Sequence, residues 1–294
     1  MGRIAIAGST GLLGTALRVR LSEQGNQVSR LVRKSSGKPD EIVWNPGTGQ
    51  IPPSSLAACD AVVNLAGEPI SKRWTHSVRR RILDSRVDTT AVLAQACVRD
   101  GVPVLVNASA TGIYGDRDDE ILDEKSPSGG GFLADVCVAW EHALRTARES
   151  GVRTASVRFG MILSETGGAL PRMRPAFKAG LGGRLGSGRQ WMPWIHLEDA
   201  VSAVIHTMGC PTISGPVLAT SPTPLRQSEF ADLLATSLGR KARAHVPAWV
   251  LRVALGAMAD ELLLCSQRCI PVRLKETGFV WAFPDPETAL ARTR

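Results

Sequence analysis

Short apolar runs alternate with amphipathic segments along the first half of the chain. The runs RIAIAG, NQVSRLV, CDAVVNLAG and VPVLVNASA are each followed by a helix-like or loop segment, and VRTASVRFG comes later. Between them, LLGTALRVRLSEQG stops at Gly25 and RRRILDSRVDTTAVLAQACVRDG stops at Gly101, and glycine commonly ends helices. Strands that alternate with helices build a parallel sheet covered on both faces. The pattern predicts an α/β fold with a doubly wound (Rossmann), mostly parallel sheet.

The alternation loosens in the second half of the chain. The stretch SETGGALPRMRPAFKAGLGGRLGSGRQW is rich in Gly, Pro and Arg, and a regular helix pattern resumes only near Glu198. We therefore expect a sheet domain over residues 1–164, completed by parts of 190–220. Residues 165–294 are expected to form a smaller, partly helical substrate lobe, with a separate C-terminal segment from about residue 245.

Composition indicates a folded, intracellular type of protein. Of 294 residues, 44% are hydrophobic and 21% are charged, which is close to the globular average. Cys265 and Cys269 lie one helical turn apart in an apolar segment, where buried free thiols are expected. The first strand pattern starts almost at Met1, which leaves no room for a signal peptide, and no apolar run reaches the roughly 18 residues of a membrane span. We expect a cytoplasmic protein with no membrane partner, and the sequence leaves assembly as a homodimer open.

The chain is basic, with a formal net charge of +8. Its Lys and Arg residues are scattered and form no single block or aromatic-interleaved stripe, so the pattern does not favour nucleic acid as a partner. A phosphorylated small molecule accounts for the charge equally well. No His, Cys or carboxylate cluster has metal-ligand spacing, so no metal site is expected.

The segment GSTGLLG, from Gly8 to Gly14, directly follows the first strand and opens the first helix. Glycines at such a turn let the backbone approach a pyrophosphate, which the free amides and positive end of the helix stabilise. The strand, turn and helix around the motif make it more specific than the glycines alone. The sequence therefore predicts a dinucleotide-binding loop.

The end of the second strand distinguishes NAD from NADP. NAD sites favour an acidic residue there, about 20 residues beyond the glycines, to accept from the ribose 2′-hydroxyl. This chain has RLVRKSSGK, with Arg33 and Lys34 in that place. Because these cations can donate charge-assisted hydrogen bonds to a 2′-phosphate, we predict NADP as the cofactor. The alternative is a solvated basic turn.

The third strand closes with NLAG, Asn64 to Gly67, where small residues let a cofactor lie against the backbone. Arg81 and Arg86 begin the next helix, within reach of phosphates if the fold is doubly wound, or else they are surface charges on that helix.

Several motifs together resemble extended short-chain dehydrogenase/reductases: the spacing of Gly8, Gly11 and Gly14, with NLAG, NASATGIYG and WIHLEDA. More narrowly, the whole chain is similar to the atypical epimerase-like branch that carries a C-terminal domain of unknown function. The resemblance implies a Rossmann domain that binds NADP and a C-terminal lobe that encloses a substrate cleft. The cofactor-binding residues that it implies are Gly8, Thr10, Gly11, Leu12, Leu13, Val32, Arg33, Leu65, Ala66, Glu68, Arg81 and Arg86.

The chain departs from that family in GFLADVCVAWEHAL. The family generally uses a Tyr and, four residues later, a Lys on this helix, because hydride transfer at a carbonyl needs a proton donor or acceptor at the oxygen. Aligned on Glu141, those positions are Leu133 and Cys137, and neither can serve in the usual way. Apolar residues recur at helical spacing here, which predicts a face that simply packs. They are Leu133, Val136, Cys137, Trp140 and Leu144.

Two residues are candidates to replace the missing pair. Ser109 ends the fourth strand, where the family's catalytic Ser lies, and Tyr114, the only tyrosine, follows in the adjoining loop. A phenol transfers a proton near neutral pH only if its pKa is lowered, and the sequence offers no Lys at helical spacing to do so. Tyr114 is therefore a candidate catalytic residue or a pocket wall.

The glycine-rich segment GLGGRLGSGRQW is a candidate substrate-binding loop. Arg184 and Arg189, near Trp191, are suited to clamp a phosphate or to stack on a base, as a nucleotide-sugar would require. The alternative is a mobile surface loop.

Two functions follow from the sequence. The first is an NADP(H)-dependent oxidoreductase or epimerase-like enzyme that acts on a small, anionic or nucleotide-sugar-like substrate. The second is a non-catalytic NADP-binding sensor or interaction protein, which the missing Tyr and Lys favour.

Overall fold

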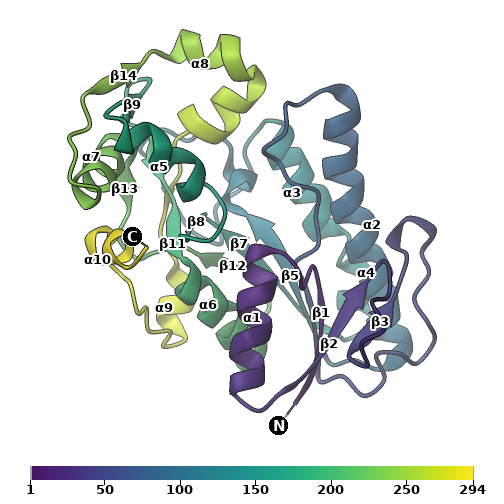
Figure 1. Ribbon diagram of the computed structural model, residues 1–294. Helices are drawn as coiled ribbons and strands as arrows, with labels where there is room; N and C mark the ends of the chain where they lie inside the picture. The colour runs from purple at the N-terminus through teal and green to yellow at the C-terminus, as the bar shows by residue number, and fades with distance from the viewer. Residues whose placement is uncertain (1, 294) are drawn as a thin grey trace. The chain divides into compact units, whose positions relative to one another are not determined.

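The computed structural model describes residues 2–293, which divide into two compact units (Figure 1). The first unit contains residues 2–109, 136–157 and 201–217. The second contains residues 110–135, 158–200 and 218–293. The expected boundary near residue 165 differs from this division, because the chain passes between the units several times and residues 110–135 group with the C-terminal half.

The helices and strands follow in chain order. Through the middle of the chain they are β1 (Arg3–Ala7), α1 (Leu12–Glu23), β2 (Gln27–Val32), β3 (Glu41–Val43), η1 (Pro46–Thr48), β4 (Ala61–Asn64), α2 (His76–Asp100), β5 (Val104–Ala110), η2 (Thr111–Tyr114), β6 (Ile121–Leu122), α3 (Phe132–His142), α4 (Arg145–Glu149) and β7 (Arg153–Phe159). The remainder are β8 (Met161–Leu163), α5 (Leu170–Lys178), β9 (Gly183–Leu185), β10 (Trp191–Met192), β11 (Trp194–His196), α6 (Leu197–Gly209), β12 (Gly215–Ala219), β13 (Leu225–Arg226), α7 (Gln227–Ser237), β14 (Ala244–Val246), α8 (Ala248–Leu255), η3 (Ala259–Leu264), β15 (Arg268–Cys269), α9 (Val272–Glu276) and α10 (Pro286–Arg292).

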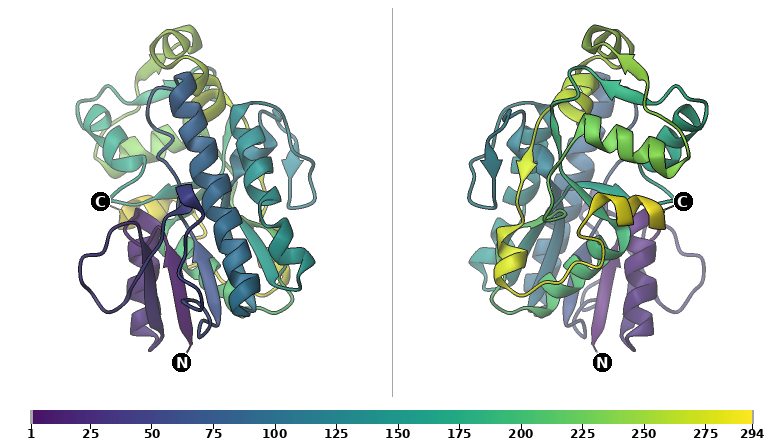
Figure 2. Two further views of the ribbon diagram at one scale, coloured as in Figure 1. Left: turned by 90° about the vertical axis from the view of Figure 1, so that its right-hand side faces the viewer. Right: turned by 90° about the vertical axis from the view of Figure 1, so that its left-hand side faces the viewer.

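A seven-stranded sheet has the order β12-β7-β5-β4-β1-β2-β3. Strand β1 pairs in parallel with both β2 and β4, and β4 pairs in parallel with β5. Helices α1 and α2 cover opposite faces of the sheet (Figure 2). The doubly wound, mostly parallel α/β fold predicted from the sequence is thereby confirmed.

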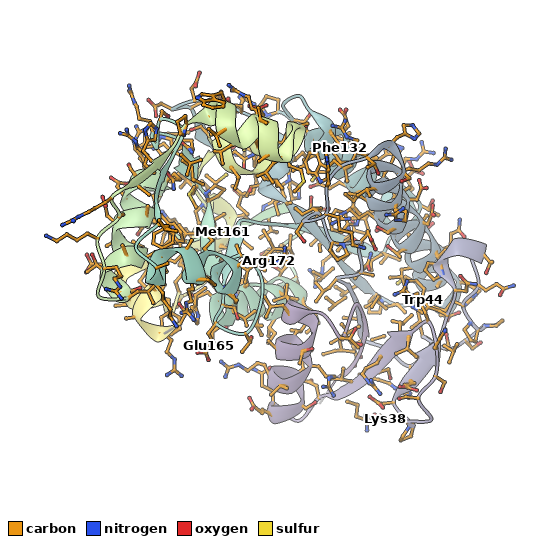
Figure 3. All side chains as sticks on the ribbon, turned by 45° about the horizontal axis from the view of Figure 1, so that its top comes forward. Lys38, Trp44, Phe132, Met161, Glu165 and Arg172 are labelled. Carbon is orange, nitrogen blue, oxygen red and sulfur yellow. The ribbon has the colours of Figure 1, made fainter. Side chains whose placement is uncertain are left out.

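One apolar cluster of the first unit lies between the sheet and helices α2 and α4. It includes Leu93, Cys97, Leu105 and Leu144, each fully buried. Helix α2 ends where the sequence predicts, because Gly101 has a φ of 70°, a left-handed conformation that glycine adopts without steric cost. Figure 3 shows Lys38 in the segment between β2 and β3 and Trp44 directly after β3.

The second unit is built from short elements. Four two-stranded sheets pair β10 with β13, β11 with β8, β14 with β9, and β15 with β6. A separate apolar cluster includes Phe177 of α5, Trp194 of β11 and Phe230 of α7. Met161 and Arg172, labelled in Figure 3, belong to β8 and α5 of this unit.

The apolar face predicted for the helix at GFLADVCVAWEHAL is buried throughout. Its members are exposed by 8% or less, at Leu133, Val136, Cys137, Trp140 and Leu144. Cys269 is buried as expected, while Cys265 is half-buried, and both thiols are free.

Candidate cofactor and substrate site

The turn between β1 and α1 requires glycine at two positions. Gly8 has a φ of 76°, and a Cβ there would lie 2.6 Å from the carbonyl of Leu65. A Cβ on Gly14 would lie 2.2 Å from the carbonyl oxygen of Gly8. Since side chains cannot approach backbone that closely, these two glycines bring the first turn of α1 against the ends of β1 and β4.

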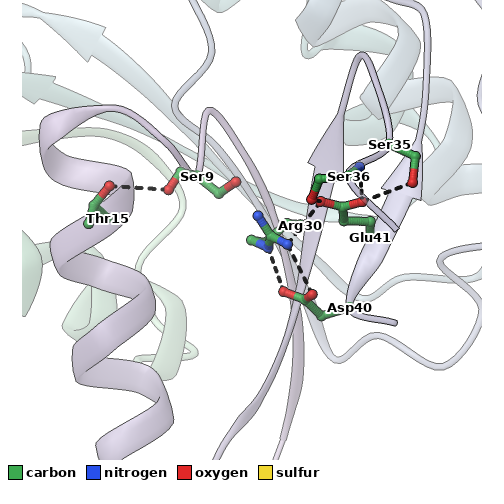
Figure 4. Close-up of polar contacts among 7 residues, drawn as sticks. All are labelled: Ser9, Thr15, Arg30, Ser35, Ser36, Asp40 and Glu41. Carbon is green, nitrogen blue, oxygen red and sulfur yellow. Dashed lines mark hydrogen bonds and ion pairs between the residues drawn. The ribbon is translucent and has the colours of Figure 1, made fainter. Parts of the chain in front are cut away.

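The same turn carries polar groups without protein partners. The Ser9 hydroxyl is buried and has no hydrogen-bond partner among residues 2–293. Helix α1 begins after Gly11, whose missing side chain leaves the first turn uncapped. Thr15 Oγ1 donates instead to the Ser9 carbonyl, at 3.4 Å (Figure 4). A helix start with open donors beside an unpaired hydroxyl fits the phosphates of a dinucleotide.

The turn after β2 is held together by the carboxylate of Glu41. It accepts from the Ser36 amide at 2.7 Å and from the Ser35 hydroxyl at 3.0 Å, and Arg30 Nη2 donates to it at 3.0 Å (Figure 4). The Ser36 hydrogen bonds hold the pKa of Glu41 at about 2. This acidic side chain is therefore engaged within its own loop.

Two cations remain on the surface of that turn. Arg33 and Lys34 are exposed, and neither forms an ion pair with another described residue. The charge of Arg33 contributes to a lowered pKa of Glu68, after the larger effect of the hydrogen bond from Lys72. The end of β2 thus presents positive charge where an NAD site would present an acid.

The predicted cofactor residues all lie in the first unit. Strands β1, β2 and β4 run parallel, so their carboxyl ends meet at one edge of the sheet, where nucleotides bind in such folds. In the turn and the first turn of α1 lie Gly8, Thr10, Gly11, Leu12 and Leu13. After β2 and β4, and on α2, lie Val32, Arg33, Leu65, Ala66, Glu68, Arg81 and Arg86.

Arg81 and Arg86 differ in their surroundings. The Arg81 side chain is 53% exposed, and its Nε lies 4.0 Å from the Glu68 carboxylate. Arg86 is half-buried, and its Nη1 donates to the carbonyl oxygens of Glu68 and Ile82, at 3.0 Å each. Its guanidinium carbon lies 5.0 Å from the centre of the Trp140 ring. Arg86 is therefore held in place, whereas Arg81 is a surface charge beside Glu68.

A buried polar network lies beneath the ends of β4 and β5. Asn64 Nδ2 donates to Thr90 Oγ1 at 3.0 Å and to Asn107 Oδ1 at 2.7 Å. Thr90 Oγ1 donates to Asn107 Oδ1 at 3.0 Å and accepts from Trp140 Nε1 at 2.9 Å. Sequence reasoning missed this network, although Asn64 and Asn107 are the first residues of the segments NLAG and NASATGIYG.

Ser109, near the end of β5, is 3% exposed, and its hydroxyl donates to the Glu141 carboxylate at 2.7 Å. Glu141 belongs to α3, the helix on which the family's Tyr and Lys would lie. The predicted catalytic serine is thus polarised by a carboxylate and keeps its oxygen lone pairs as acceptors.

Tyr114 lies within the second unit and is fully buried. Its hydroxyl donates to the Asp123 carbonyl oxygen at 2.8 Å and accepts from Arg158 Nη1 at 2.8 Å. Burial raises the pKa of this phenol, against a smaller opposing effect of the Arg158 charge. These contacts favour a structural role, because a buried hydroxyl with both bonds engaged makes a poor proton relay.

A cavity of about 190 Å³ in the second unit is lined by Leu133, the residue at the family's Tyr position. Glu261 accepts from the amides of Phe132 and Leu133, at 3.2 and 2.7 Å, and so caps the start of α3. Asp260 and Arg252 form an ion pair at 2.8 Å. The lining residues are Gly112, Gly115, Asp116, Gly130, Leu133, Arg252, Asp260, Glu261, Leu264 and Gln267. With three carboxylates and one guanidinium, this lining is acidic.

The predicted substrate loop lies elsewhere in the second unit. Arg184 belongs to β9, and Arg189 is exposed in the following loop. Trp191 donates through Nε1 to Asp119 at 2.7 Å, and the guanidinium groups of Arg226 and Arg268 lie 4.3 and 4.7 Å from its ring centre. Neither arginine of the predicted trio lines the acidic cavity, and neither does Trp191.

A family model described as the NAD dependent epimerase/dehydratase family matches residues 4–212. The chain belongs to this family. A second model, for a domain of unknown function (DUF1731), matches residues 246–293. The resemblance to an epimerase-like short-chain dehydrogenase/reductase with a C-terminal domain of unknown function is therefore confirmed.

Three similar proteins place the chain within the epimerase family. An epimerase family protein of Mycobacterium bovis is 45% identical over 277 residues, which cover 94% of this chain and 92% of that protein. The crystal structure of human epimerase family protein SDR39U1 with NADPH has a TM-score of 0.89 at 33% identity, covering 99% and 98% of the two chains. The nucleoside-diphosphate sugar epimerase of Corynebacterium glutamicum has a TM-score of 0.83 at 33% identity, covering 99% of this chain and 58% of that one.

Two further classes of feature are absent from residues 2–293 of this epimerase-family chain. No helix there combines the length and apolar character needed to cross a membrane. No group of three or more His, Cys, Asp or Glu side chains in that range is arranged to hold a metal ion.

Proposed function

We propose that the chain binds NADP(H) through its first unit. The observation that carries this proposal is the pairing of an uncapped glycine turn with a basic β2 end, where Arg33 and Lys34 are exposed and Glu41 is engaged within its own loop. The human relative with 33% identity was crystallised with NADPH, which supports the same cofactor here. The phosphates would be held by the amides at the start of α1, and the 2′-phosphate by Arg33.

We further propose that the chain is an oxidoreductase or epimerase-like enzyme. When bound, NADP(H) supplies or accepts the hydride. Ser109 would hold the substrate oxygen, with Glu141 accepting the Ser109 proton and leaving the serine oxygen able to accept from a substrate hydroxyl. Tyr114, the second catalytic candidate, is better suited to fix the loop through Asp123 and Arg158.

The substrate would be a small carbonyl compound or alcohol. The exposed Arg184 and Arg189 favour an anionic or nucleotide-sugar-like substrate, as does the activity named for the Corynebacterium glutamicum relative. The acidic cavity beside Leu133 favours instead a neutral, hydroxyl-rich substrate, because carboxylates repel phosphate and accept from hydroxyl groups. A cytoplasmic location remains part of the proposal.

The second candidate is a non-catalytic NADP(H)-binding sensor or interaction protein. Leu133 and Cys137, both buried, stand where the family has its proton-transferring pair, and this is the observation that favours it. The two candidates share the cofactor and differ only in whether hydride leaves it.

Deuterium transfer separates the two. The purified chain is incubated with NADPH deuterated at either face of the nicotinamide ring, together with a panel of neutral sugars, nucleotide-sugars and small carbonyl compounds. Stereospecific appearance of deuterium in any product establishes the enzyme, and its loss in Ser109→Ala identifies the residue. An epimerase starts from the oxidised cofactor and returns its hydride, so the same panel is also incubated with NADP+ and scored for epimerised sugars. Tight NADP(H) binding with neither deuterium transfer nor epimerisation for any panel member would favour the sensor.

A further inference from the structure

The acidic cavity of the second unit is lined from two distant parts of the chain. One part is residues 112–133, and the other is residues 252–267, which lie in the stretch that matches the domain of unknown function. Asp260, Glu261 and Leu264 belong to η3, a π-helical turn. Such turns are rare and occur frequently at functional sites. The C-terminal segment therefore supplies much of the lining of this cavity.

Gln267 brings an unpaired acceptor to the lining. Its side chain is 5% exposed, and its Nε2 donates to the Gly115 carbonyl oxygen at 3.0 Å. That bond orients the amide, and Oε1 accepts from none of residues 2–293. Because an amide oxygen loses stabilisation when it is taken from water without a partner, this one is suited to accept from a ligand.

Asp116 lies at the exposed edge of the same lining. Its Oδ1 accepts from the Ser266 amide at 2.8 Å, and within residues 2–293 its Oδ2 has no hydrogen-bond partner. The other charges of the lining are engaged, since Asp260 pairs with Arg252 at 2.8 Å and Glu261 accepts from two amides at the start of α3. One carboxylate oxygen and one amide oxygen thus remain for a ligand.

The arginines that follow the lining in the chain are engaged elsewhere. Arg117 pairs with Glu120 at 2.6 Å, and Arg226 pairs with Asp119 at 2.9 Å. The Arg268 guanidinium carbon lies 4.7 Å from the centre of an indole ring. Carboxylates outnumber guanidinium groups three to one in the lining itself, so a ligand there meets negative charge.

We propose that the cavity binds the protonated amino group of a small hydroxylated compound, with Gln267 Oε1 and Asp116 as acceptors. An ammonium donates three hydrogen bonds and accepts none, which matches unpaired acceptors beside negative charge. The volume of about 190 Å³ is below the roughly 300–1,000 Å³ of pockets for drug-sized ligands, which favours a ligand of about one sugar ring. The C-terminal segment thereby selects against phosphorylated compounds.

This inference deepens the proposed function, on which it rests for the ligand's role as substrate. The binding preference itself is measured without cofactor, so it is tested separately from NADP(H) binding.

The test compares three ligands that share one ring: glucosamine, glucose and glucose 6-phosphate. Their dissociation constants are measured by ligand-observed NMR titration, at a pH where the amine is protonated, for wild type, Asp116→Asn and Gln267→Met. Asp232→Asn is the control, because Asp232 is an exposed carboxylate on α7 outside the lining. Thermal unfolding and NADPH affinity of each variant are measured in parallel.

We expect glucosamine to bind the wild type about tenfold more tightly than glucose, and glucose 6-phosphate to bind most weakly. Asp116→Asn should remove most of the preference for glucosamine, because the amide keeps the Ser266 contact and loses the charge. Gln267→Met should weaken glucosamine and glucose alike, by about fivefold. Asp232→Asn should change none of these affinities.

Three results would overturn the inference: binding of none of the three ligands, tightest binding of glucose 6-phosphate, or a glucosamine preference that Asp116→Asn and Asp232→Asn both keep. Wild-type protein that prefers glucosamine but binds no NADPH would sink the proposed function and leave the cavity's preference standing, so the two failures are distinguishable.

Discussion

Two regions of the first unit differ in whether their polar groups have partners within the protein. At the glycine turn and the β2 end, the Ser9 hydroxyl and the cations Arg33 and Lys34 have no protein partner among residues 2–293. On α3, Glu141 accepts from Ser109 and Trp140 donates to Thr90. The first region is prepared for a charged ligand, while the second is arranged mainly to fix its own side chains.

The comparison indicates that this fold can keep the backbone features of a cofactor site without the side chains that usually transfer the proton. The turn around Gly8 and Gly14 keeps its backbone geometry, since neither position has room for a Cβ. The face of α3 keeps its burial but has Leu133 and Cys137 in place of titrating groups. The polar groups near that face are Ser109, which donates to Glu141, and Arg86, whose guanidinium carbon lies 5.0 Å from the centre of the Trp140 ring.

The largest expected effect comes from filling the glycine turn. Gly14→Ala would place a Cβ 2.2 Å from the Gly8 oxygen, so we expect it to destabilise the fold by about 3 kcal/mol and to abolish NADPH binding. Gly11→Ala would meet only the Gly8 oxygen at 3.4 Å and should bind NADPH weakly while unfolding at the wild-type temperature. Thermal unfolding and calorimetry check both.

Gly209→Ala is the control for these variants, since nothing lies within 4 Å of a Cβ there. If Gly11→Ala binds NADPH as the wild type does, the turn is not the phosphate site.

A smaller effect is expected from inverting the charge at the β2 end. Arg33→Asp replaces a phosphate-binding cation with the acid typical of NAD sites. The affinity for NADPH should therefore fall about 100-fold, and the affinity for NADH should exceed that of the wild type. Fluorescence titration of both cofactors measures this. An unchanged ratio of the two affinities would show that Arg33 is only a solvated surface charge.

A more modest effect is expected from removing the hydrogen bond that orients the Trp140 ring next to Arg86. Thr90→Val keeps the volume of the side chain but removes the acceptor for Trp140 Nε1. We expect this change to weaken the affinity for NADPH by about 3- to 10-fold. Because the Arg33 end is untouched, 2′,5′-ADP, which lacks the nicotinamide half, should bind normally. Loss of both affinities in parallel would show that the network only supports the fold.

The smallest effect concerns pH. Hydrogen bonds from Ser36 lower the pKa of Glu41 from 4.5 to about 2, so the carboxylate stabilises the folded loop above pH 4.5 and loses that contribution as the pH falls toward 2. Glu41→Gln should unfold at a lower temperature than the wild type at pH 7 and converge with it near pH 2. Glu149→Gln, an exposed ion-pair partner of Arg145, serves as the control. Parallel curves for wild type and Glu41→Gln would contradict this role.

The sequence could predict what depends on local chemistry. The glycine turn follows from the residues themselves, since strand, turn and helix are adjacent in the chain, and the basic β2 end is visible as RLVRKSSGK. The apolar face of α3 follows from helical spacing, and all of its members are buried.

Contacts between distant segments could not be predicted. Arg86 meets Trp140 only after α2 and α3 have packed on the same sheet, and no local pattern marks the pair. Tyr114 looked available in its loop, but Arg158, 44 residues later, binds its hydroxyl. Glu261, which caps α3, comes from 128 residues beyond Leu133.

One measurement tests the central claim most directly: the dissociation constants of NADPH and NADH for the unmodified chain, determined by calorimetry under one set of conditions. The exposed Arg33 and Lys34, with Glu41 engaged in its loop, predict that NADPH binds at least about tenfold more tightly than NADH. Equal affinities, or tighter binding of NADH, would contradict the account.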